Sequence, residues 1–99
     1  MANYIYFIRC GAYCKIGVAD NISRRLSQLQ TGNPIKLDVI TVYQLDDAEY
    51  VEKLLHGDYN GNRELGEWFL LSDIDIVKAK SRCILLGGQL IEEYGNREG

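Results

Sequence analysis

The sequence predicts a small α/β (α+β) domain in which helices cover a sheet. Stretches rich in aromatic and β-branched residues alternate with amphipathic stretches, in the order β-β-α-β-α-β-α. The apolar share of 46% and the charged share of 25% are typical of globular proteins, which argues against disorder. Ninety-nine residues are enough for one hydrophobic core and too few for two. We therefore expect a single domain over residues 1–99, with a small mixed sheet that buries one face of each helix.

The first two strands are expected to form a hairpin. Residues 4–9 read YIYFIR, and residues 13–18 read YCKIGV, with Gly11 in the short turn between them. Side chains alternate along a strand, so Tyr4 and Tyr6 should share one face.

An amphipathic helix should follow the hairpin. Apolar Ile22, Leu26 and Leu29 recur at i, i+4 and i+7, and residues 20–21 (Asp-Asn) offer two side chains that can cap it. Glycine and proline within residues 31–34 end it.

The middle of the chain should supply two further strands and a helix. The expected elements are a strand over 35–45, a helix from 48 to about 56, a glycine-containing loop over 57–66 and a strand over 67–71. The apolar side of the helix would contain Tyr50, Val51, Leu54 and Leu55.

A long last helix is expected over residues 73–94. Ser72 and Asp75 match the capping box that begins a helix, and the glycine pair 87–88 could kink the helix or end it early. Its apolar surface exceeds what one small sheet needs, so we expect it to serve as a homodimer surface. The residues concerned are Ile84, Leu85, Leu86, Leu90 and Ile91.

Composition and charge limit the expected location of the protein and the partners it could bind. No apolar run approaches the roughly 20 residues of a membrane span, and the start of the chain does not read as a signal peptide. We expect a cytoplasmic protein whose thiols at Cys10, Cys14 and Cys83 are reduced. The net charge of −3 lacks the overall basicity that usually accompanies nucleic-acid binding, although a local basic face is compatible with it.

Two groups of residues could carry chemistry. Glu52 and His56 are four residues apart and share one helix face, where they could bind a metal, share a proton or simply form a surface pair. Arg24 and Arg25 could hold phosphate oxygens or form a solvated helix face, and only one of them can face a given site.

Taken together, these segments resemble the GIY-YIG nuclease superfamily over about residues 4–71. Residues 4–6 (Tyr-Ile-Tyr) stand where the family has GIY, and residues 15–17 (Lys-Ile-Gly) stand where it has YIG. The sequence is most similar to a phage and microbial branch with KIG in place of YIG, related to the meiotically up-regulated gene 113 domain. Three later segments also match that branch: QLQTGNP at 28–34, E-x-x-x-H at 52–56 and GEWF at 66–69.

The resemblance implies a sandwich around a three-stranded antiparallel central sheet, followed by a C-terminal helix over 72–94. It also implies a metal-dependent endonuclease that hydrolyses phosphodiester bonds, with DNA the more expected substrate than RNA. The cofactor would be one Mg²⁺ or Mn²⁺ ion. The alternative is an inactive module of the same fold that binds nucleic acid or a protein partner.

The resemblance assigns roles residue by residue. Tyr6 corresponds to the catalytic tyrosine, and Lys15, in place of a second tyrosine, would work beside it near the attacking water. A phenol near a cation can have a lowered pKa and can then help to deprotonate water. Arg25 corresponds to the arginine that contacts the scissile phosphate, and its neighbour Arg24 is the alternative in that position. Glu52 corresponds to the metal ligand.

The remaining candidates follow from the same resemblance. His56 matches the branch pattern as a catalytic residue. Lys15, Arg24 and Arg25 would form the nucleic-acid-binding face. Tyr4, Tyr13 and Glu67 are further candidate site residues.

Overall fold

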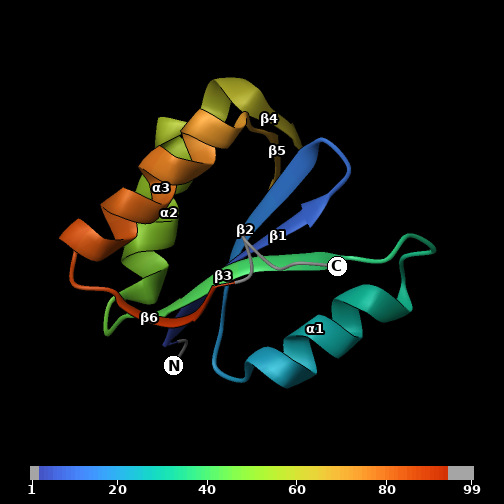
Figure 1. Cartoon of the computed structure of the whole chain (residues 1–99), viewed down its shortest axis with the longest axis horizontal. Helices are drawn as coiled ribbons and strands as arrows, with labels where there is room; N and C mark the ends of the chain where they lie inside the picture. Colours follow the sequence, from blue (N-terminus) through green and yellow to red (C-terminus); the bar gives the residue numbers. More distant parts are fainter. Residues whose placement is uncertain (1–2, 94–99) are drawn as a thin grey trace.

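The chain folds into a six-stranded antiparallel sheet with three helices distributed over its two faces (Figure 1). The computed structural model describes residues 3–93. The strands are β1 (Tyr4–Cys10), β2 (Tyr13–Ala19), β3 (Asp38–Gln44), β4 (Arg63–Leu65), β5 (Trp68–Leu70) and β6 (Gln89–Glu93). The helices are α1 (Ile22–Thr31), α2 (Ala48–Asp58) and α3 (Asp73–Leu85), with a 3-10 turn, η1, at Asn60–Asn62. The α/β class is confirmed, whereas the expected three-stranded sheet is too small.

The strand order β4-β5-β2-β1-β3-β6 places the predicted hairpin at the centre of the sheet. The tight turn around Gly11, whose φ is +62°, pairs Cys10 with Tyr13. The same register places Tyr6 opposite Gly17. β3 then pairs with the free side of β1, and β5 pairs with the free side of β2.

The sheet separates two hydrophobic layers. Helices α2 and α3 cover one face, and α1 covers the other (Figure 1). Alternation along β1 sends Ile5 and Phe7 into the first layer and Tyr6 and Ile8 into the second. Tyr4 packs on the Tyr6 side, as the alternation predicts.

Helix α1 forms as its sequence predicts. The Asn21 side chain accepts a hydrogen bond from the Arg24 backbone N–H at 2.9 Å, so Asn21 is the N-cap. Ile22, Leu26 and Leu29 pack against the sheet on the Tyr6 side.

Helix α3 begins as predicted but ends nine residues before the predicted limit of 94, at Leu85. Its capping box at Ser72 and Asp75 is present in both directions at 3.1 Å. Gly87 has a φ of +100°, and Gly88 donates to the Cys83 carbonyl at 2.8 Å, which together form a Schellman motif. A Cβ on Gly88 would lie 2.8 Å from that carbonyl oxygen. The glycine pair therefore ends the helix, and the chain returns as β6; residue 94 lies outside the described residues.

The predicted loop over 57–66 is wrong in part. Helix α2 continues to Asp58, η1 follows, and β4 pairs with β5 around Gly66, whose φ is +57°. Three-residue strands bounded by glycine leave too short an alternation to recognise. Tyr50, expected on the buried side of α2, is 61% exposed instead.

The apolar residues expected to form a dimer surface are exposed, and they extend from the end of α3 onto β6. The homodimer stays a prediction. Within residues 3–93, no helix is both long and apolar enough to cross a bilayer. The three cysteines are free thiols, and burial raises the pKa of Cys14 and of Cys83 to about 12.

Candidate active site

Three ionisable side chains from distant parts of the chain meet beside the central strand β2. Glu52 and His56 lie one turn apart on α2, and Glu67 lies in the turn that precedes β5. One ligand atom from each of these residues lies within 4.8 Å of the other two. The Glu52 and His56 side chains are only 13% and 14% exposed, and their nearest atoms are 4.0 Å apart. Glu52, His56 and Glu67 are called the cluster below.

The imidazole of His56 forms a hydrogen bond with the backbone of β2. Its Nε2 atom lies 2.8 Å from the carbonyl oxygen of Ile16. A carbonyl oxygen only accepts hydrogen bonds, so Nε2 carries the proton and donates it. The ring also packs on Phe69, with 5.0 Å between ring centroids. His56 thus connects α2 to β2. The two carboxylates provide the oxygen ligands of the cluster.

Negative charge in this cluster is only partly balanced. The pKa of Glu52 is raised to about 7, chiefly by burial and next by the nearby Glu67 carboxylate, while Lys15 acts in the opposite direction. The Lys15 ammonium group lies 3.3 Å from Glu67. Two carboxylates lie close together here, and the pKa of one of them is raised. A divalent cation would offset their repulsion and accept their oxygens as ligands. The donor set therefore fits Mg²⁺ or Mn²⁺, with Glu52 and Glu67 as the residues that would hold it.

Tyr6 approaches the same cluster from the other face of the sheet. Its side chain is fully buried, and its hydroxyl has no hydrogen-bond partner among residues 3–93. A Cβ on Gly17 would lie 2.6 Å from Tyr6 Cζ and 3.1 Å from Glu67 Oε1. The missing side chain of Gly17 therefore opens the space in which the phenol and the carboxylate converge.

Arg25, and not Arg24, lies close to Tyr6. Burial raises the pKa of the Tyr6 phenol, and the Arg25 guanidinium is the cation that opposes this rise; Glu67 and Glu52 add to it. Arg24 instead forms an exposed ion pair with Asp20 at 3.1 Å. Burial has the largest effect, so the pKa of Tyr6 is raised in the free protein. The expected lowering of this pKa by a neighbouring cation is therefore wrong for the free protein.

Lys15 links the cluster to an aromatic side chain. Its ammonium group lies 5.5 Å from the centre of the Trp68 ring, and its side chain is only 13% exposed. Tyr4 and Tyr13 lie outside the cluster: Tyr4 packs in the α1 layer, and Tyr13 is 42% exposed near the hairpin turn. The structure thus brings together Tyr6, Lys15, Arg25, Glu52, His56 and Glu67.

Sequence reasoning placed Glu67 among the candidate site residues but did not relate it to Glu52, and it missed the part played by Gly17. The position of Glu67 before a core strand carries no spacing signal that relates it to Glu52, yet the two belong to one cluster. Gly17 faces Tyr6 directly, and counting residues outward from the two-residue turn of the hairpin could have revealed this.

Comparison with family models gives a match to the T5orf172 domain over residues 3–84. That range spans every strand and helix except the end of α3 and β6. The chain belongs to the T5orf172 domain family. This is a nuclease-related phage domain family, and membership indicates a nuclease-like or nucleic-acid-related function. Comparison of this T5orf172 domain with curated proteins and with solved structures gave no match.

Proposed function

We propose that this T5orf172 domain is a GIY-YIG-type metal-dependent endonuclease that hydrolyses phosphodiester bonds of nucleic acid, DNA more than RNA. The single observation that carries the proposal is the convergence of Tyr6 and Glu67 over the bare backbone of Gly17, where Glu67 also belongs to the cluster with Glu52 and His56. A buried hydroxyl without a partner costs folding free energy, so its presence beside two carboxylates is typical of a functional site.

The cluster would hold one divalent cation through Glu52 and Glu67. When bound, Mg²⁺ or Mn²⁺ supplies Lewis-acid polarisation of phosphate oxygens and lowers the pKa of a bound water. His56 keeps α2 against β2, which fixes the distance between the two carboxylates.

The other side chains would act on water and phosphate. The protonated Tyr6 hydroxyl can hydrogen-bond an attacking water, since it can both donate and accept. Arg25 offers a forked donor for phosphate oxygens on the same side of the sheet. Lys15 balances Glu67 in the free protein and can contact phosphate when substrate binds.

The test is cleavage of plasmid, branched DNA and RNA with Mg²⁺ or Mn²⁺, comparing wild type with Glu52→Gln. Glu49→Gln is the matched control, because Glu49 is an exposed glutamate one turn away on the same helix. We expect cleavage by wild type and by the control, and its loss in Glu52→Gln. Folded wild-type protein that cleaves none of the substrates would instead favour an inactive module that binds nucleic acid or a protein partner.

A further inference from the structure

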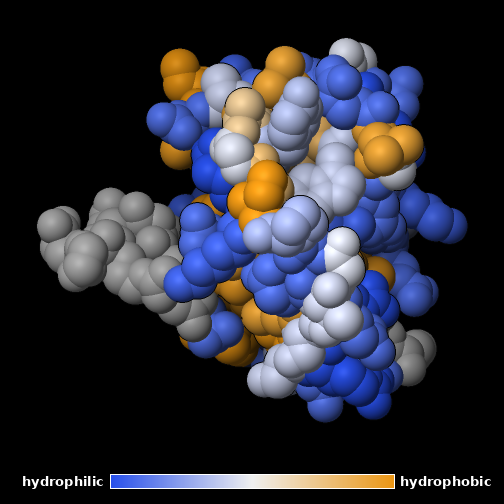
Figure 2. Space-filling view, turned by 90° about the vertical axis from the view of Figure 1, so that its right-hand side faces the viewer, coloured by the Kyte–Doolittle hydropathy of each residue, from blue (hydrophilic) through white to orange (hydrophobic). Residues whose placement is uncertain are grey.

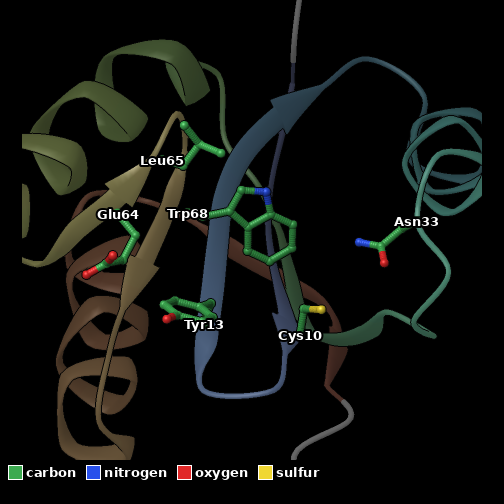
Figure 3. A pocket seen from close by; sticks show the side chains of 6 residues that line it. All are labelled: Cys10, Tyr13, Asn33, Glu64, Leu65 and Trp68. Carbon is green, nitrogen blue, oxygen red and sulfur yellow. The ribbon is translucent and has the colours of Figure 1, made fainter.

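We infer that a pocket beside the candidate active site binds one unpaired nucleobase of the nucleic-acid substrate. The inference rests on the proposed function and adds a substrate class to it. The pocket has a volume of about 230 Å³ and lies between the β1–β2 hairpin, the β4–β5 hairpin and the loop after α1 (Figure 3). Its lining residues are Cys10, Tyr13, Asn33, Glu64, Leu65 and Trp68.

The walls of the pocket are suited to a flat ring. Figure 3 shows the indole of Trp68 at its centre, with the Tyr13 ring toward the hairpin turn and the Leu65 side chain on the opposite side. Tyr13 is 42% exposed and Leu65 is 77% exposed, so both present apolar surface to solvent. Every nucleobase has a π-face that stacks on such rings, whatever its sequence. The face of the molecule seen in Figure 2 is mostly hydrophilic, with separate hydrophobic patches.

Asn33 adds a polar group directed at the occupant. Its Oδ1 accepts a hydrogen bond from the Ile35 backbone N–H at 2.9 Å, which fixes the orientation of the amide. Its Nδ2 therefore points toward the Trp68 ring (Figure 3), and it donates no hydrogen bond within residues 3–93. An amide N–H in this position matches the carbonyl and ring-nitrogen acceptors at the edge of a base.

Trp68 connects the pocket with the candidate active site through its contact with Lys15. Trp68 is the cross-strand partner of Lys15, whose ammonium group lies 5.5 Å from the indole centre and 3.3 Å from Glu67. A base stacked on Trp68 would carry its own phosphate toward Lys15. Bases stacked and paired inside a duplex cannot enter a pocket, so the occupant must be extrahelical, single-stranded or at a branch point.

Trp68 is the sole tryptophan of the chain, so its fluorescence reports directly on this site. The probes are a DNA duplex with one extrahelical base and the same duplex with an abasic residue in its place. Both are titrated in EDTA, so that binding is measured without cleavage. We expect the base-bearing duplex to quench Trp68 and to bind more tightly than the abasic one.

Tyr13→Ala tests the stacking wall. We expect this variant to bind the base-bearing duplex about 10-fold more weakly, with its affinity for the abasic duplex unchanged. Tyr13→Phe should keep the wild-type preference. Tyr50→Ala is the matched control, because Tyr50 is an exposed tyrosine on α2 that does not line the pocket.

The possible outcomes separate the two proposals. Equal affinity for the two duplexes, or an unaltered preference in Tyr13→Ala that folds normally by circular dichroism, would overturn the base site. A clear preference for the extrahelical base without cleavage in Mg²⁺ or Mn²⁺ supports the base site and overturns only the proposed hydrolysis.

Discussion

The hydroxyl end of Tyr6 lies over the backbone of Gly17, its cross-strand neighbour in the central hairpin. No other residue at position 17 keeps this geometry, since a Cβ there would occupy the space of the phenol. Because Glu67 lies at the rim of the same space, this one contact brings Tyr6 close to the cluster that Glu67 forms with Glu52 and His56.

Substitution of Gly17 by alanine should destabilise the protein. The added Cβ would meet Tyr6 Cζ at 2.6 Å, and overpacking of this kind costs about 1–3 kcal/mol. Urea unfolding followed by circular dichroism measures the free energy of unfolding. Gly57→Ala is the control, because that helical glycine has nothing within 4 Å of the new Cβ and should gain stability. Equal stability of Gly17→Ala and wild type would show that Tyr6 does not occupy this space.

Tyr6→Phe should separate activity from stability. The lost hydroxyl has no partner among the described residues, so its removal should leave the free energy of unfolding unchanged or raise it by about 1 kcal/mol. Cleavage should fall at least about 100-fold if the hydroxyl hydrogen-bonds the attacking water. Both are measured on one preparation. Full cleavage by Tyr6→Phe would remove the phenol from the mechanism.

Arg25→Ala and Arg24→Ala should differ. Arg25 faces Tyr6, whereas Arg24 forms a surface ion pair with Asp20. Loss of a preorganised donor to phosphate typically costs about 100- to 1,000-fold in rate, so we expect Arg25→Ala to lose that much cleavage. Arg24→Ala should change cleavage only a few-fold. Steady-state cleavage rates at saturating metal test this order, and the reverse order would contradict it.

The metal-free protein should lose stability as the pH rises toward 7. The pKa of Glu52 is about 7 in the folded protein and about 4.5 in an unfolded chain, so the native state favours the protonated form. Its contribution is fully present below pH 4.5 and is lost as the pH rises through 7, by about 1–3 kcal/mol in total.

Urea unfolding in EDTA at pH 5 and pH 8 measures this loss. Glu52→Gln should show a much smaller difference between the two pH values, whereas Glu49→Gln, which removes only a minor contribution to the raised pKa of Glu52, should retain most of it. The stabilisation gained on adding Mg²⁺ should rise over the same pH range, because a metal ligand must be ionised. An unchanged pH dependence in Glu52→Gln would assign the titration to another group.

Local sequence patterns were sufficient for the elements that depend on neighbouring residues. The hairpin at residues 4–19, helix α1 with its Asn21 cap and the capping box of α3 all follow from residues within a few positions of one another. The same holds for the pairing of Glu52 with His56 on one helix face. The glycine pair 87–88 was recognised as a possible early end of α3, but strand β6 was not predicted, because it forms by pairing with β3, which is distant in the sequence.

The sequence by itself determined the mixed α/β class, the central hairpin, the caps and the residue types available for chemistry. Only the tertiary structure decided which of them meet. Glu67 joins Glu52 because β5 pairs with β2 beneath α2. Arg25, rather than its neighbour Arg24, lies beside Tyr6 because α1 packs with position 25 half-buried and position 24 exposed to solvent. The physical reason is that caps and periodicity act over one or two turns, whereas a site between a sheet and its helices depends on strand register and helix packing between segments far apart in the chain.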